Sequence, residues 1–109
     1  MEPIPVNIPR IQGREKELLI ECIDTGWISS EGPFVREFEK RMAERFGRKH
    51  AIAVSNGTGA LDCALKSLQL EQGDEVILPT FTIISCATAI LNAGATPVPV
   101  DMDPDTWNM

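Results

Sequence analysis

The spacing of apolar and polar residues predicts strands that alternate with helices in the second half of the chain. Residues 51–55 are small or apolar, which predicts a buried strand, and Asn56-Gly57-Thr58-Gly59 after it predicts a tight turn. A helix is predicted next, because apolar residues recur at the spacing of one helix face, at Leu61, Ala64, Leu65 and Leu68.

Two more strands are predicted further along, at residues 75–79 and 95–100. Residues 80–82 lead into the helix between them, which should run to about Ala93 and be heavily buried, because its apolar residues cover more than one narrow stripe. Strand, helix and strand joined by short connections require right-handed crossovers and a parallel sheet. The predicted fold class is α/β, with parallel strands and helices on both faces of the sheet.

The first part of the chain predicts an arm and two helices. Three prolines keep residues 1–12 extended. An amphipathic helix is predicted over residues 13–25 and ends at Gly26. A second helix is predicted over residues 33–46, and we expect its large apolar residues to be core: Phe34, Phe38, Met42 and Phe46.

The turn after the first predicted strand is a candidate anion site. In parallel sheets ligands bind beyond the carboxyl ends of the strands, where residues 55–58, 79–83 and 100–103 are expected. The first N–H groups of a helix lack internal partners, and the helix dipole adds about half a positive charge there. Gly57 and Gly59 have no side chain to keep an anion from the backbone, and Thr58 adds a hydroxyl. A purely structural turn has the same pattern, so both interpretations stay open.

The loop over residues 26–33 has two interpretations as well. In one it is a packed connector in which Trp27 fills a gap between helices. In the other it is a binding loop, with apolar surface from Trp27 and Ile28 and hydrogen bonds from Ser29 and Ser30.

Charge and composition exclude several classes of function. The net charge is −6 and no long basic run occurs, which argues against nucleic acid as a partner. No apolar run approaches the ~20 residues that cross a bilayer, and the N-terminal sequence lacks the pattern of a leader, so we expect a cytoplasmic protein without membrane contact.

The residues that often bind metals are expected to have structural roles. The three cysteines are widely spaced among apolar helical neighbours, which predicts free thiols that act as small core residues. Asp101, Asp103 and Asp105 predict an ordinary turn and cap, and His50 is expected to be solvated or to cap. No metal site is predicted.

The chain ends where another element should follow its last turn, so we expect a fragment of a longer α/β protein. Residues 1–47 are predicted to form an arm with two helices, and residues 48–109 to begin a larger domain.

Several segments together resemble the start of the DegT/DnrJ/EryC1/StrS family, especially its perosamine-synthase-like members. The segments are, in order, Gly26–Ser30, Val54–Thr58, Gly73–Pro79, Thr80–Thr82, Gly94–Val98 and Val100–Thr106. These relatives are aminotransferases that depend on pyridoxal phosphate (PLP) and act on nucleotide-linked sugars. One departure is Asp62, where relatives commonly have a histidine.

The resemblance implies the N-terminal part of a fold-type I PLP-dependent transferase that works as a homodimer. It implies that Gly57 and Thr58 bind the cofactor phosphate, while Asn56 shapes the turn. Ile83 occupies a position where relatives often place an aromatic ring against the pyridine, so here an aliphatic side chain would pack on the cofactor. The loop Trp27–Ser30, with Ile28 and Ser29, resembles a segment that borders the substrate.

No catalytic residue is assigned within the chain. A Schiff base requires a lysine amine at the cofactor aldehyde, and the candidates are Lys16, Lys40, Lys49 and Lys66. Lys66 would lie roughly 12 Å along the helix from Thr58, on the face opposite Leu61, and would point away from the site. The resemblance places the lysine and the acidic partner of the pyridine nitrogen after residue 109, so we expect the chain alone to be inactive.

The implied activity is transfer of an amino group from an amino acid such as glutamate to a keto nucleotide-sugar. A rival from the same family is a PLP-dependent sugar dehydratase, in which histidine replaces the lysine. Rivals from other classes are a non-catalytic α/β interaction module and a phosphate-binding enzyme of unrelated chemistry.

Overall fold

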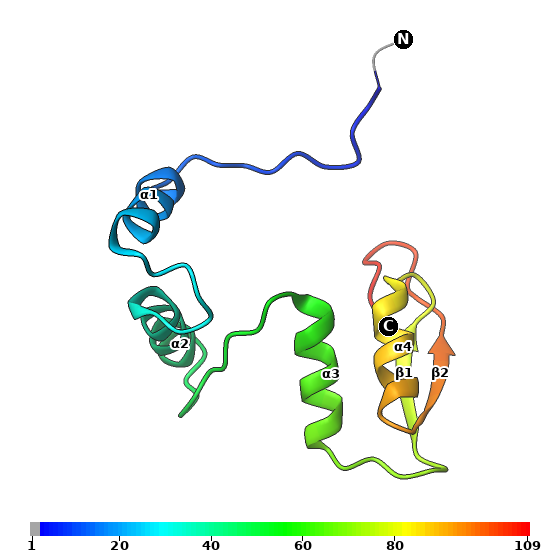
Figure 1. Cartoon of the computed structure of the whole chain (residues 1–109). Helices are drawn as coiled ribbons and strands as arrows, with labels where there is room; N and C mark the ends of the chain where they lie inside the picture. Colours follow the sequence, from blue (N-terminus) through cyan, green and yellow to red (C-terminus); the bar gives the residue numbers. More distant parts are fainter. Residues whose placement is uncertain (1–2) are drawn as a thin grey trace. The chain divides into compact units, whose positions relative to one another are not determined.

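The computed structural model describes residues 3–109, which divide into two compact units (Figure 1). The first unit extends to Ala53 and the second is Val54–Met109. The predicted domain boundary after residue 47 stays a prediction, since a division by packing is not a division into domains.

The first unit contains two helices, as predicted, and residues 3–12 before them form neither helix nor strand; residues 1 and 2 of the predicted arm lie outside the described residues. Helix α1 (Glu15–Thr25) ends at Gly26, whose φ of 75° is in the left-handed region that favours glycine. Helix α2 (Pro33–Arg45) begins with a proline, whose missing N–H costs nothing in a first turn. Neither helix has a fully buried residue.

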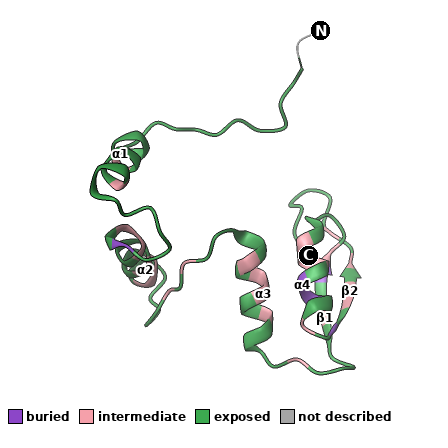
Figure 2. Ribbon diagram, in the orientation of Figure 1, coloured by how far each residue is buried: buried purple, intermediate pink, exposed green. Residues whose placement is uncertain are grey.

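The expectation that the large apolar residues of α2 form a core is wrong for two of them. Phe38 is 54% exposed and Phe46 is 65% exposed, whereas Phe34 and Met42 are half-buried. Figure 2 shows how little of this unit is buried. The physical reason is the lack of neighbours, because α1 and α2 alone cannot cover an apolar stripe from all sides.

The second unit alternates helices and strands in the order α3 (Gly57–Ser67), β1 (Glu75–Pro79), α4 (Ile84–Asn92) and β2 (Thr96–Val100). The two strands pair in parallel, from Glu75 opposite Thr96 to Pro79 opposite Val100. Gly94, with φ of 87°, follows the end of α4 and permits the reversal into β2. The predicted α/β class and the parallel pairing are confirmed.

The strand predicted at residues 51–55 is wrong for this chain. Within residues 3–109 the sheet has two strands, β1 and β2, and residues 51–55 pair with neither. Ile52 is 83% exposed. A buried apolar run becomes a strand only when another strand supplies its hydrogen bonds. The segment is held instead by the N–H of Ala53, which donates to Glu39 Oε1 at 2.9 Å.

The core of the second unit lies between α4 and one face of the sheet. Leu78, Ile90 and Ala95 are buried there, and Leu65 of α3 packs against them. Ile77, whose side chain points to the other face of β1, is 60% exposed. Within the described residues, therefore, helices cover only one face of this sheet.

Helix α4 is much less buried than predicted. Ala89 and Ile90 are its buried residues, while Ile84 is 72% exposed and Leu91 is 59% exposed. The expectation for the cysteines also needs correction, because Cys63 is exposed and Cys22 and Cys86 are half-buried. All three are free thiols.

The outer side of β2 carries two prolines. The N–H of Thr96 donates to Asp74 O at 2.8 Å and Val100 O accepts from Thr80 N–H at 3.0 Å, so residues 96, 98 and 100 bond toward β1. The backbone nitrogens of Pro97 and Pro99 therefore face away from β1 and carry no hydrogen.

Along residues 3–109, no helix is both long enough and apolar enough to cross a membrane.

The core predicts a large difference between two neighbouring residues of α4. Ile90→Ala should lower the free energy of unfolding by about 2–5 kcal/mol, because it leaves a cavity between helix and sheet. The matched control Leu91→Ala, at an exposed position of the same turn, should lower it by less than about 1 kcal/mol. Denaturant unfolding of both variants checks this, and equal losses would contradict the assigned core.

Candidate functional site

The first turn of α3 leaves two backbone amides free. Asn56 caps the helix, since its Oδ1 accepts a hydrogen bond from Gly59 N–H at 2.8 Å and its carbonyl accepts one from Ala60 N–H at 3.1 Å. Within residues 3–109 the N–H groups of Gly57 and Thr58 have no hydrogen-bond partner. Both residues are exposed, so these amides are available to an anion.

Gly57 matters for access rather than for backbone conformation. Its φ is not in the left-handed region, so another residue could adopt the same backbone. A Cβ at this position would meet no atom within 4 Å, whereas one at Gly59 would lie 3.6 Å from Asn56 Oδ1. The space beside Gly57 is therefore open.

A second helix begins beside this turn. Thr58 Oγ1 donates a hydrogen bond to Ser85 Oγ at 3.0 Å, which joins the first turns of α3 and α4. Ile83 is the N-cap residue of α4 and is 67% exposed, so its apolar side chain is available next to the hydroxyl pair. The structure thus brings Asn56, Gly57, Thr58 and the loop that holds Ile83 to the same end of the second unit.

Sequence reasoning missed Ser85. The segment 79–83 was predicted to lie at the ligand-binding edge of the sheet, but Ser85 follows it inside the helix. The sequence feature that points to Ser85 is a hydroxyl residue in the first turn of a helix that follows a strand. Its pairing with Thr58 joins residues 27 positions apart and has no local signature.

Asp62 follows Thr58 by one helical turn, on the same side of α3. Its Oδ1 is buried and has no hydrogen-bond partner among residues 3–109. A buried acceptor without a donor is costly, so this oxygen is an unsatisfied acceptor beside the turn.

The loop predicted to border the substrate forms a cleft of about 370 Å³ in the first unit. Trp27, Ile28 and Ser29 line it together with Leu19 and Phe34. The Trp27 ring lies over Gly32, where an added Cβ would meet Trp27 Cβ at 3.6 Å. Ser29 Oγ is engaged within the loop, since it donates to Glu31 O at 3.0 Å. Both the connector and the binding-loop interpretations fit this geometry.

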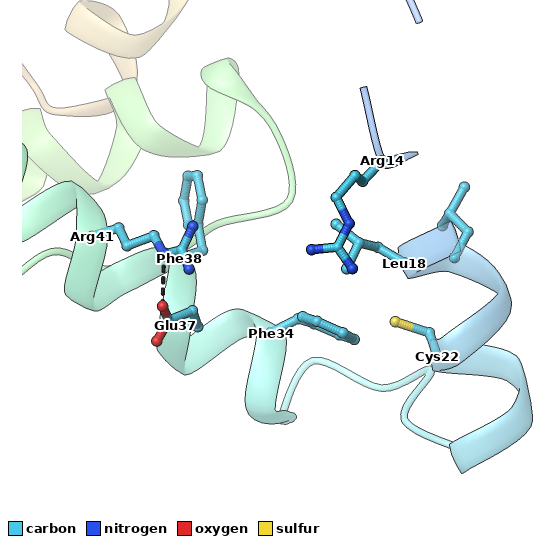
Figure 3. A pocket seen from close by; sticks show the side chains of 8 residues that line it. Arg14, Leu18, Cys22, Phe34, Glu37, Phe38 and Arg41 are labelled. Carbon is cyan, nitrogen blue, oxygen red and sulfur yellow. Dashed lines mark hydrogen bonds and ion pairs between the residues drawn. The ribbon is translucent and has the colours of Figure 1, made fainter. Parts of the chain in front are cut away.

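A larger apolar cleft, of about 430 Å³, lies between α1 and α2 (Figure 3). Its apolar wall comes from Leu18, Cys22, Phe34 and Phe38. At its edge Arg41 Nε donates to Glu37 Oε1 at 2.6 Å, and this hydrogen bond lowers the pKa of the Glu37 carboxyl. The charged groups at the edge thus pair with each other.

Comparison with known proteins identifies the family. The model of the DegT/DnrJ/EryC1/StrS aminotransferase family matches residues 9–109. The chain belongs to this family. A GDP-perosamine synthase of Caulobacter vibrioides is 51% identical over 106 residues, which are 97% of this chain and 29% of that protein.

Two solved structures with PLP have a similar fold. A candidate sugar aminotransferase of Streptococcus pneumoniae in its PLP form has a TM-score of 0.81 and 34% identity, over 95% of this chain and 26% of its own. The GDP-4-keto-6-deoxy-D-mannose-3-dehydratase of E. coli with bound hydrated PLP has a TM-score of 0.84 and 25% identity, over 100% of this chain and 29% of its own. The chain thus spans less than a third of the length of these DegT/DnrJ/EryC1/StrS relatives.

Within the second unit, no lysine lies near the first turn of α3. Lys66 is the lysine of the second unit and lies in the last turn of α3, at the opposite end of the helix from Gly57. Lys16, Lys40 and Lys49 belong to the first unit. The geometry of the second unit therefore offers an anion site without an amine.

Asp103 organises the turn after β2. Its Oδ1 accepts hydrogen bonds from Thr106 N–H at 2.7 Å, Asp105 N–H at 3.0 Å and Thr106 Oγ1 at 3.0 Å. These bonds lower the pKa of the Asp103 carboxyl, and the bond from the Thr106 backbone N–H has the largest effect. The predicted turn-and-cap role is confirmed for this residue. The turn also holds Trp107 against Phe81, with the ring centroids 5.1 Å apart.

This turn should loosen in acid. A lowered pKa means that the fold favours the carboxylate, so the stabilisation is present above the ordinary pKa of aspartate and is lost as the pH falls through the lowered value. In a Trp27→Phe background, Trp107 fluorescence should change over that range. Asp103→Asn should remove the transition, and an unchanged transition in this variant would assign it to another group.

Proposed function

We propose that this chain supplies the N-terminal part of a PLP-dependent aminotransferase that acts on keto nucleotide-sugars. The observation that carries the proposal is the pair of free amides at Gly57 and Thr58, in a chain whose family includes proteins solved with PLP. The two amides and the open space beside Gly57 together fit a phosphate group.

Each residue of the site has a proposed role. Gly57 and Thr58 donate their amides to the cofactor phosphate, and Asn56 keeps the turn in place by capping Gly59. Ile83 packs its aliphatic side chain on a face of the cofactor ring. PLP, when bound, supplies the electron sink for bond changes at the amino-bearing carbon. The protein orients it by its phosphate.

Substrate binding is assigned to the loop of the first unit. Trp27 and Ile28 offer apolar surface in a concave cleft, and Ser29 presents a hydroxyl there. The proposed partners are a keto nucleotide-sugar and an amino acid donor such as glutamate. The proposal includes a homodimer and a cytoplasmic location, and the three free thiols support a reducing compartment.

The rival function is dehydration of a keto nucleotide-sugar, which the likeness to the E. coli dehydratase favours. The 51% identity to a GDP-perosamine synthase supports the aminotransferase more strongly. The two differ in their sugar products, because an aminotransferase yields an amino sugar, whereas a dehydratase removes a hydroxyl group and leaves no nitrogen on the sugar. Incubating the longer protein with glutamate and a keto nucleotide-sugar and analysing the products by mass spectrometry separates the two.

Two glycine variants of that longer protein test the phosphate site. Gly57→Ala should weaken PLP binding at least about tenfold, since a methyl group would stand between the anion and its amides and a hydrogen bond to a charged group contributes about 1.5–3 kcal/mol. Gly59→Ala is the matched control, because its amide already bonds to Asn56.

Both variants place alanine in a helix, which should raise stability slightly, so unfolding cannot cause the loss. Equilibrium dialysis with PLP gives the affinities, and pyridoxal, which lacks the phosphate, serves as a second control. A Gly57→Ala variant that binds PLP as well as the unmodified protein would refute the proposed phosphate site.

A further inference from the structure

The hydroxyl pair of Thr58 and Ser85 stands where two helices begin. Helices α3 and α4 pack against each other, and the hydrogen bond of 3.0 Å joins their first turns. Their positive ends therefore lie together, and the potentials of both dipoles add at this place. Ser85 is half-buried and Thr58 is exposed, so the pair lies at the surface of the turn.

The start of α4 leaves amides free, as does the start of α3. The N-cap residue of α4 is Ile83, whose side chain cannot accept a hydrogen bond. Within residues 3–109 the N–H groups of Ile84 and Ser85 have no partner. Neither helix has an acidic residue in its first turn, although the chain contains 16 aspartates and glutamates. Both helix starts thus lack the internal anion that could satisfy them.

The positions of the two hydroxyl protons determine which hydroxyl group can donate a hydrogen bond to an anion. Thr58 uses its only hydroxyl proton on Ser85 Oγ. The hydroxyl proton of Ser85 has no acceptor among residues 3–109. An ionised phosphate group mainly accepts hydrogen bonds, so Ser85 is the member of the pair that can donate to it while the bond between the helices persists.

We propose that Ser85 is a further cofactor-binding residue, which donates its hydroxyl to a phosphate oxygen of PLP while Thr58 fixes its orientation. This inference rests on the proposed function and adds a residue from α4 to a phosphate site otherwise built from α3. Ser85 thereby links the loop that holds Ile83 to the phosphate-binding turn at the start of α3.

The test compares two α4 variants of the longer protein. Ser85→Ala should weaken PLP binding about tenfold and leave pyridoxal binding unchanged, because only PLP has the phosphate. Ser85→Thr retains a hydroxyl and should bind PLP within about threefold of the unmodified protein. Thr88→Ala is the matched control, since its hydroxyl bonds only to the carbonyls of Ile84 and Ser85 within the helix. Dialysis gives the affinities, and thermal unfolding gives the stabilities.

The outcomes separate this inference from the function on which it rests. An unmodified protein that does not bind PLP overturns both. If Ser85→Ala binds PLP normally, or if PLP and pyridoxal binding fall equally with the unfolding temperature, Ser85 only ties the helices together and this inference alone is wrong. A loss specific to PLP in Ser85→Ala, absent in Thr88→Ala, supports it.

Discussion

A helix cannot satisfy the N–H groups of its own first turn, and this constraint shapes the functional end of the second unit. At α3, Asn56 satisfies one amide through its side chain and another through its carbonyl. At α4, Ile83 offers no side-chain acceptor. Most helices resolve the deficit with a capping side chain, an acid or water. Here the unpaired N–H groups of two helix starts lie on either side of one hydrogen bond between hydroxyl groups. A single external phosphate could therefore accept hydrogen bonds from both helix starts.

Local features of the fold were predictable because they depend on neighbours in the sequence. Gly26 follows the helix that it was expected to end, and β1 occupies the predicted residues 75–79. The turn at Asn56 was recognisable because its cap closes over three residues. Burial was predicted poorly, since it depends on what packs against a face. The segment 51–55 has a strand pattern, and Ile84 and Leu91 of α4 have a core pattern, but among residues 3–109 nothing pairs with the segment or covers these two side chains.

The residues of the candidate site were likewise predictable only where they form a local sequence motif. Asn56, Gly57 and Thr58 form one continuous motif, and the resemblance to relatives pointed to them directly. Ser85 came to light only from the three-dimensional arrangement, because its contact joins two helices. The orphaned oxygen of Asp62 was equally invisible in the sequence, where this residue was only a departure from the common histidine.

The two prolines of β2 make the two edges of the sheet unequal as partners for a further strand. Pro97 and Pro99 leave the outer side of that strand without donors, whereas Glu75 and Ile77 retain theirs on the free side of β1. Pro79 also lacks an N–H on the free side of β1, so an incoming strand finds two amide donors beside β1 and none from residues 97 and 99 of β2. The same asymmetry makes β2 a poor template for stray chains, so the open sheet is shielded from edge-to-edge aggregation on that flank.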